Sequence, residues 1–155
     1  MKKFACYVVR HSLAGKRGTA ADEQRPLSKR GRAQARRIAE TLDDAGITRL
    51  LASPYVRCIE TLEPLAARIG IDIEVRDDLG EGNGASATLA LVDAADAPIA
   101  ICSHGDVIGE LIEALDERDV PRDDDRMAKG STWVLTRRGR DIVDAHYVPP
   151  PKADT

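Results

Sequence analysis

The sequence is poor in aromatic residues and cysteines, and it has no long hydrophobic run. Aromatic residues make up 3% of the 155 residues, so stacking on nucleobases would have few candidates, of which Tyr55 is the best placed. The three cysteines are odd in number and widely separated, which argues against a disulfide framework and against a zinc site. No apolar stretch approaches the roughly 18 residues that cross a membrane, and the first residues do not resemble a secretory signal. We therefore expect a cytoplasmic protein with reduced, buried thiols.

The length and composition are those of one globular domain. A chain of 155 residues suits a single hydrophobic core. Hydrophobic residues make up 43% and charged residues 32% of the chain, which is a globular balance. We assign residues 1–148 to this domain and expect the proline-rich residues 149–155 to form a flexible tail.

The charge is unevenly distributed along the chain. The net charge of −3 does not favour a nucleic-acid partner, yet residues 10–37 hold nine Lys or Arg against two acids, a local balance of +7. Such a stretch in an acidic protein indicates either a local anion site or a solvated helix face. Its second half, from Lys29 to Arg37, fits the helix face.

Strands alternate with helices along the chain. Apolar runs predict strands at residues 4–9, 49–52, 71–75, 98–102, 131–136 and 142–146, the last two joined by a turn at Arg138-Gly139. Helices are expected to begin at Ser28 and Ser53, to cover 86–94, and to present an apolar face from Val107 to Leu115. This alternation predicts a three-layer α/β/α fold with a mainly parallel central sheet.

Local residues predict where the first two helices begin and end. Gly46 stands where a left-handed C-terminal cap belongs. Ser53 followed by Pro54 predicts an N-cap with proline at the first helical position, and Pro64 is expected to kink the second helix.

Unusual polar residues follow three of the predicted strands. In open α/β sheets, ligands bind beyond the carboxyl ends of the strands. Arg10-His11 follows the first strand, Arg57 lies in the helix start after the second, and His104 follows the fourth. Each alone also fits a surface or structural residue, but two of the three histidines stand at strand ends, and only His146 has a structural setting. Together they predict one crevice that binds phosphate through a helix N-terminus and an arginine fork.

Four motifs in this order resemble the histidine-phosphatase superfamily, and most closely its small SixA-type branch. They are Val9-Arg10-His11, residues 25–31 (RPLSKRG), residues 53–61 (SPYVRCIET) and Ser103-His104-Gly105. A similar domain follows a Nudix domain in some actinobacterial proteins. The resemblance covers nearly all of residues 4–148 and implies the phosphoglycerate mutase-like fold.

The resemblance implies a role for each matching residue. His11 would be the nucleophile that becomes phosphohistidine, and Arg10, Arg57 and His104 would complete the quartet that holds the phosphate. Glu81 aligns with the segment where many members carry the proton donor. The surrounding glycines leave the register open, so Asp78 competes with Glu81 for this role.

Further residues are expected near the phosphate. Arg25 matches a basic residue that the SixA-type branch places there. Ser12 replaces the glycine of the Arg-His-Gly sequence found in many members, which changes the local loop. Lys16 and Arg17 are candidates for binding a second phosphate or a carboxylate, although a solvated loop would look the same.

Elementary chemistry is consistent with the implied mechanism. Attack on phosphorus requires a neutral imidazole, which a histidine with an ordinary pKa of about 6.5 provides at neutral pH. Arginines and a second histidine stabilise the charge on the equatorial oxygens, and a carboxylic acid protonates the leaving oxygen. No aspartate cluster has a spacing typical of Mg²⁺, so we predict no metal and no other cofactor.

The substrate is left open by the sequence. The short segments between Arg57, Glu81 and His104 leave little room for a lid, so an open, shallow site is expected. That suits a phosphohistidine on a partner protein, but also a nucleotide or sugar phosphate. A phospholigand-binding module that has lost turnover, or an unrelated α/β domain, are the alternatives to a phosphatase.

Overall fold

A six-stranded sheet organises the chain, whose computed structural model describes residues 2–18 and 21–153. The strands are β1 (Lys3–Arg10), β2 (Arg49–Ala52), β3 (Ile73–Val75), β4 (Ile99–Ser103), β5 (Thr132–Arg138) and β6 (Asp141–Val148). Their order across the sheet is β3-β2-β4-β1-β5-β6. The first four are parallel, β5 runs antiparallel to β1, and β5 and β6 form a hairpin. The predicted mainly parallel sheet is therefore confirmed, whereas the turn expected at Arg138-Gly139 lies one residue later, at Gly139 and Arg140.

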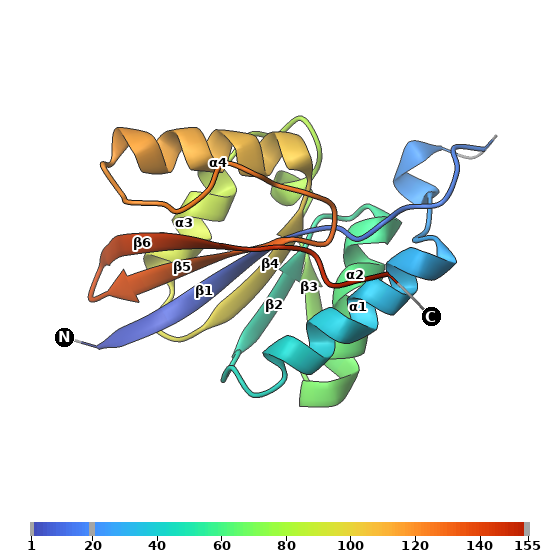
Figure 1. Cartoon of the computed structure of the whole chain (residues 1–155), viewed down its shortest axis with the longest axis horizontal. Coiled ribbons are helices and arrows are strands. Elements are labelled where there is room, and N and C mark those ends of the chain that lie inside the picture. The colour runs from blue at the N-terminus through green and yellow to red at the C-terminus, as the bar shows by residue number, and fades with distance from the viewer. Residues whose placement is uncertain (1, 19–20, 154–155) are drawn as a thin grey trace.

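Helices cover both faces of this sheet. They are α1 (Lys29–Leu42), α2 (Val56–Ile69), α3 (Ser86–Ala94) and α4 (Gly105–Glu117), with 3₁₀ turns η1 (Asp22–Gln24) and η2 (Asp77–Leu79). Figure 1 shows α1 and α2 on one side of the sheet and α3 and α4 on the other. This is the three-layer α/β/α architecture expected.

Each face of the sheet has its own apolar core, because side chains alternate along a strand. Neighbours on β1 separate in this way: Val8 packs in the cluster that contains Leu111 of α4, whereas Val9 packs with Leu62 of α2. All of these side chains are buried. The two cores hold β1, β2 and β4 rigidly, and their carboxyl ends therefore form a fixed platform.

The second helix begins later than predicted. Tyr55, not Ser53, is its N-cap, and Pro54 stays outside the helix. Ser53 instead extends the end of β2, since its backbone N–H donates to the carbonyl of Cys102 at 3.1 Å. Its hydroxyl forms a hydrogen bond with the His104 ring and does not cap the helix. The Ser-Pro pair thus places a side chain at the sheet edge before the helix starts.

One other local prediction is revised. Helix α1 ends at Leu42 with Asp43 as its cap, so Gly46 does not cap it. Gly46 has a positive φ of 75° and lies in the segment between α1 and β2. Helix α2 continues through Pro64 to Ile69, and the kink expected at Pro64 stays a prediction.

The proline-rich end lies against the domain as far as the structure describes it. Gln34 of α1 donates through Nε2 to the carbonyl of Pro151 at 3.3 Å, and Ala153 is buried. Residues 154 and 155 of the expected tail lie outside the described residues. In the described part of the chain, no helix has the length and apolar character needed to cross a membrane.

Candidate active site

The two histidines of the strand ends lie together. Strands β1 and β4 are neighbours with Arg10 opposite Ser103, and the backbone N–H of His11 donates to the Ser103 carbonyl at 3.1 Å. The rings of His11 and His104 consequently approach edge to face, with 5.5 Å between their centroids. The two histidines expected at neighbouring strand ends therefore lie side by side, and we call the space around them the crevice.

His11 has one ring nitrogen available for chemistry. Its Nδ1 lies 2.9 Å from the Ser12 carbonyl oxygen, which can only accept, so we assign the proton to Nδ1 and the lone pair to Nε2. The side chain is 4% exposed. Burial lowers the pKa of His11 to about 3, with Arg57, His104 and Arg10 adding to the effect and the Ser12 carbonyl opposing it. The imidazole is therefore neutral at physiological pH.

His104 is held through one nitrogen only. Its Nε2 lies 2.8 Å from Ser53 Oγ and 3.6 Å from Cys58 Sγ, and the Tyr55 ring packs edge-on against it at 4.5 Å. Its Nδ1 is buried and has no hydrogen-bond partner among the residues that the structure describes. The ring is thus fixed by its neighbours while one nitrogen stays free.

Arg10 crosses the start of α4, and a glycine makes room for it. Its Nη1 donates to the Met127 carbonyl at 2.8 Å, and its buried Nε has no hydrogen-bond partner in the described part of the chain. A Cβ on Gly105 would come within 2.8 Å of Arg10 Cζ. The glycine after His104 therefore serves to admit the guanidinium.

Arg57 is clamped by a residue of the loop after β1. Its Nη1 donates to the backbone carbonyl of Asp22 at 2.9 Å and its Nη2 to Asp22 Oδ2 at 3.1 Å. Asp22 thereby occupies the terminal edge of the guanidinium, while the buried Nε on its lateral edge has no partner within residues 2–18 and 21–153. Through Oδ1, Asp22 also accepts from Arg25 Nε at 3.0 Å. Sequence reasoning missed Asp22, because an acid in a basic loop looks like an ordinary surface residue.

Unpartnered buried atoms concentrate at this crevice. Seven buried side-chain N or O atoms have no partner among the described residues, and four belong to Arg10, Ser12, Arg57 and His104. Most buried polar groups in proteins are hydrogen-bonded, and an unpaired donor costs free energy. A phosphoryl group bound here would supply hydrogen-bond partners for these four groups, which are two guanidinium N–H groups, an imidazole nitrogen and a hydroxyl.

Of the two candidate proton donors, only Glu81 lies beside the quartet. Its Oε2 is 3.9 Å from Arg57 Nη2, and its side chain is 50% exposed. Asp78 instead forms a two-pronged pair with Arg76, at 2.7 and 3.0 Å, which holds the pKa of Asp78 below its usual range. The geometry thus favours Glu81.

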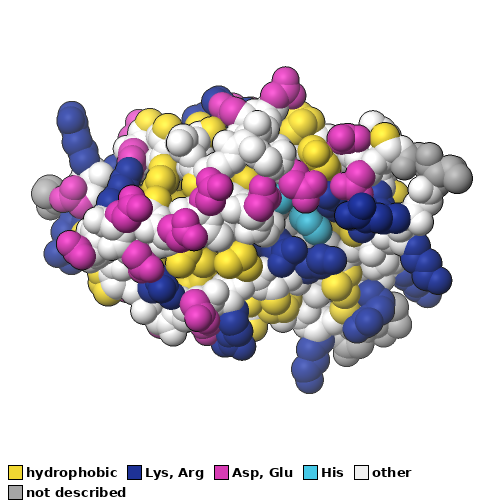
Figure 2. Space-filling view, turned by 90° about the horizontal axis from the view of Figure 1, so that it is seen from above, with side chains coloured by type: hydrophobic (Ala, Val, Ile, Leu, Met, Phe, Trp, Pro, Cys, Tyr) yellow, Lys and Arg dark blue, Asp and Glu magenta, His cyan; other side chains and the backbone are white. Residues whose placement is uncertain are grey.

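The remaining predicted residues flank the crevice. Arg25 contacts Asp22, which in turn contacts Arg57 of the crevice. Lys16 and Arg17 are exposed. Together with Asp22 and Arg25 they line a hollow of about 440 Å³. Lys129 is a further cation near these residues, which the sequence did not predict. Partial burial is the main cause that lowers the pKa of Lys129, and the positive charges of Arg10, Arg25 and Arg57 lower it further. Figure 2 shows Lys and Arg side chains on two sides of the histidine atoms visible in this view and acidic side chains on a third.

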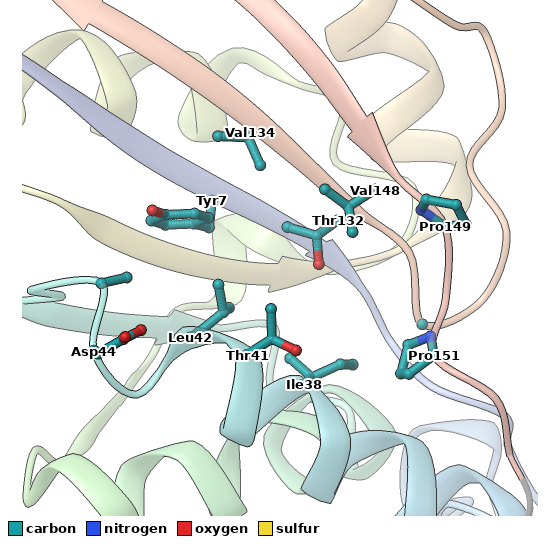
Figure 3. A pocket seen from close by; sticks show the side chains of 12 residues that line it. Tyr7, Ile38, Thr41, Leu42, Asp44, Thr132, Val134, Val148, Pro149 and Pro151 are labelled. Carbon is teal, nitrogen blue, oxygen red and sulfur yellow. The ribbon is translucent and has the colours of Figure 1, made fainter.

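A separate apolar hollow of about 560 Å³ lies between the sheet and α1 (Figure 3). The hollow is lined by apolar side chains that include Tyr7, Ile38, Leu42 and Val148, and by none of the predicted site residues.

Within residues 2–18 and 21–153, no group of three or more His, Cys, Asp or Glu side chains is arranged to hold a metal ion. The chemistry therefore concentrates at the strand ends.

Comparisons with known proteins agree with this geometry. A model of the histidine phosphatase superfamily (branch 1) matches residues 6–88. An 8-oxo-(d)GTP phosphatase of Mycolicibacterium smegmatis is 40% identical over 153 residues, which cover 93% of this chain and 48% of the relative. This chain thus spans about half the length of that relative. An uncharacterized protein of Picosynechococcus is 32% identical over 70% of this chain and 71% of its own.

Solved structures share the fold. The protein histidine phosphatase SixA, complexed with tungstate, superposes with a TM-score of 0.76 at 21% identity and covers 97% of both chains. Mycobacterial glucosyl-3-phosphoglycerate phosphatase superposes with a TM-score of 0.64 at 18% identity, over 95% of this chain and 97% of its own. From the matched family model and the 32% identical relative, the chain belongs to the histidine phosphatase superfamily, branch 1.

Proposed function

We propose that this protein is a metal-independent phosphatase that transfers a phosphoryl group to Nε2 of His11 and then to water. The observation that carries the proposal is the set of unpartnered buried polar atoms of Arg10, Ser12, Arg57 and His104 around a neutral His11. A phosphoryl group would supply the missing partners. A phospholigand-binding module would need the same pocket, but it would not need a buried imidazole kept neutral.

Each residue has a distinct part in this proposal. Nε2 of His11 bonds to phosphorus while the bond to the leaving oxygen breaks. Arg10, Arg57 and His104 stabilise the charge on the equatorial oxygens. Glu81 gives a proton to the leaving oxygen and then takes one from the water that cleaves the N–P bond. This second step releases inorganic phosphate and restores the neutral imidazole of His11 and the protonated carboxyl group of Glu81.

Two substrate classes fit an open site of this kind. The SixA fold suggests a phosphohistidine on a partner protein, and the Mycolicibacterium relative is named for a nucleotide. A sugar phosphate, as in the name of the glucosyl-3-phosphoglycerate phosphatase, is a second small-molecule possibility. A cytoplasmic location stays a prediction.

The test is hydrolysis of p-nitrophenyl phosphate by the wild type, His11→Ala and the matched control His146→Ala. His146 lies on β6, where its Nδ1 contacts Asp123 away from the crevice. We expect His11→Ala to abolish turnover and His146→Ala to retain it. Undiminished hydrolysis by His11→Ala would reject the phosphohistidine mechanism.

A further inference from the structure

The entrance to the phosphate pocket carries more positive charge than one phosphoryl group requires. Of the nine basic residues between positions 10 and 37, Lys29 to Arg37 contribute five to α1. The other four lie at the end of β1 and in the following loop: Arg10, Lys16, Arg17 and Arg25. Arg10 belongs to the phosphate quartet, which leaves three cations beside it.

These three cations share one hollow with Asp22. Lys16, Arg17 and Arg25 line the hollow of about 440 Å³, and Asp22 forms the wall between it and Arg57. The hollow therefore adjoins the phosphate pocket directly, since a single carboxylate contacts Arg25 on one side and Arg57 on the other.

The outer cations are available to a ligand. The Arg17 side chain is 80% exposed, and its contact with a described carboxylate is a 4.0 Å approach to Asp22, which Arg25 and Arg57 already engage. Lys16 is exposed and has no ion pair or hydrogen bond with any residue that the structure describes. Lys129 adds a further cation within the field of the same arginines.

We propose that the hollow lined by Lys16, Arg17 and Arg25 binds a second phosphate of the substrate, so that the protein prefers organic diphosphates to monophosphates. This rests on the proposed phosphatase function. Nε2 of His11 would bond to the terminal phosphorus as the anhydride P–O bond breaks, and the electron pair of that bond would leave with the organic phosphate. Water would then cleave the N–P bond and release inorganic phosphate.

The chemistry of the leaving group gives the proposal a second consequence. An organic phosphate leaves as a stabilised anion whose charge the cations of the hollow offset, whereas an alkoxide needs a proton. Replacing the proton donor should therefore harm diphosphate hydrolysis less than monophosphate hydrolysis. Because kcat/KM reports the transfer of the phosphoryl group to His11 and not the later attack of water, Glu81→Gln is expected to lower kcat/KM for AMP at least about tenfold more than kcat/KM for ADP.

The direct test compares phosphate release from ADP and AMP, which share the same nucleoside. The variant is Lys16→Ala/Arg17→Ala, and the matched control is Arg30→Ala/Arg36→Ala, which removes the same charge from the exposed face of α1. The wild type should favour ADP in kcat/KM. The loop variant should lower the ADP-to-AMP ratio about tenfold, mainly through KM, as two modest charge-assisted contacts would, and the control should keep the ratio.

The outcomes separate this inference from the function on which it rests. If the wild type hydrolyses AMP and ADP but the ratio is the same in all three proteins, the diphosphate inference is wrong and the phosphatase proposal stands. A preference for a phosphohistidine-bearing protein over both nucleotides would overturn the inference as well. If the wild type hydrolyses none of these substrates, nor p-nitrophenyl phosphate, both proposals fail. Circular dichroism of each variant checks that it is folded.

Discussion

At the residue scale, the state of His11 follows from its surroundings. Burial, together with two arginines and a second histidine nearby, disfavours the cationic form of the His11 ring. The Ser12 carbonyl accepts a hydrogen bond from Nδ1 and so keeps the one remaining ring proton on that nitrogen. Nε2 thus keeps its lone pair without a carboxylate partner. The same burial has a cost that can be measured in folding.

The depressed pKa of His11 predicts a pH-dependent stability. Between the folded value of about 3 and the ordinary value of 6.5, the unfolded chain binds the proton more readily, so stability falls as pH falls through this window. At pH 5 the contribution of His11 should be about 2 kcal/mol less favourable than at pH 7. Urea unfolding of the wild type and His11→Asn at both pH values measures it. Equal losses of stability in the two proteins would show that His11 is not the group responsible.

The proton donor is tested by two carboxamide variants. Glu81→Gln should reduce kcat on p-nitrophenyl phosphate or AMP by about 10²-fold or more, with inorganic phosphate binding near normal. Asp78→Asn serves as the control, because Asp78 is engaged by Arg76 outside the crevice. Full loss with Asp78→Asn and none with Glu81→Gln would reverse the assignment.

At the scale of elements, the loop after β1 folds back and determines the position of an α2 side chain. Ala14 bridges to Leu27, and Ser28 N–H donates to the Leu13 carbonyl at 2.9 Å, so the loop is closed at its base. Asp22 of η1 then reaches Arg57 at the start of α2. These contacts thereby join the loop and the helix into one unit beside the crevice.

Asp22→Ala should disturb this unit. Without the carboxylate, one of the two contacts on the terminal edge of Arg57 is lost, and we expect kcat/KM for phosphomonoesters to fall by about 10²-fold. Glu23→Ala is the matched control, because Glu23 is a neighbouring exposed acid. Increased phosphate affinity in Asp22→Ala would instead show that Asp22 competes with the substrate.

Two glycines of α4 provide a second test of element packing. Alanine favours a helix over glycine by about 1 kcal/mol, so Gly105→Ala and Gly109→Ala both gain helix propensity. At Gly105 the new methyl group would meet Arg10 Cζ at 2.8 Å, whereas at Gly109 the nearest atom is Met127 Cε at 3.5 Å. Only Gly105→Ala should lose activity in the p-nitrophenyl phosphate assay. Equal activities would mean that Arg10 can move without consequence.

At the scale of the whole molecule, the sheet brings together residues that are remote in sequence. The alternation of strands and helices predicted the neighbouring strand ends and hence the meeting of His11 with His104. It could not predict Asp22 or Lys129, because each lies outside the strands and α-helices, on a segment whose path depends on tertiary contacts. Ser53 shows another limit, since a local Ser-Pro pattern favours a helix start while the sheet uses the same hydroxyl to hold His104.

The absence of a metal from the proposed mechanism is also a property of the whole site. Arg10, Arg57 and His104 would supply the positive charge that a metal ion supplies elsewhere. We expect EDTA to leave the hydrolysis of p-nitrophenyl phosphate unchanged. Loss of activity in EDTA that added Mg²⁺ or Zn²⁺ restores would contradict this prediction.

The central claim is tested most directly by trapping the phosphorylated enzyme. Protein mixed with p-nitrophenyl phosphate is quenched in alkali, where phosphohistidine is stable, and digested for mass spectrometry. We expect one phosphoryl group on His11 of the wild type and none on the His11→Ala variant. The phosphohistidine should accumulate in Glu81→Gln, because that substitution slows its hydrolysis. Turnover without any phosphate on His11, or with phosphate on another residue, would contradict it.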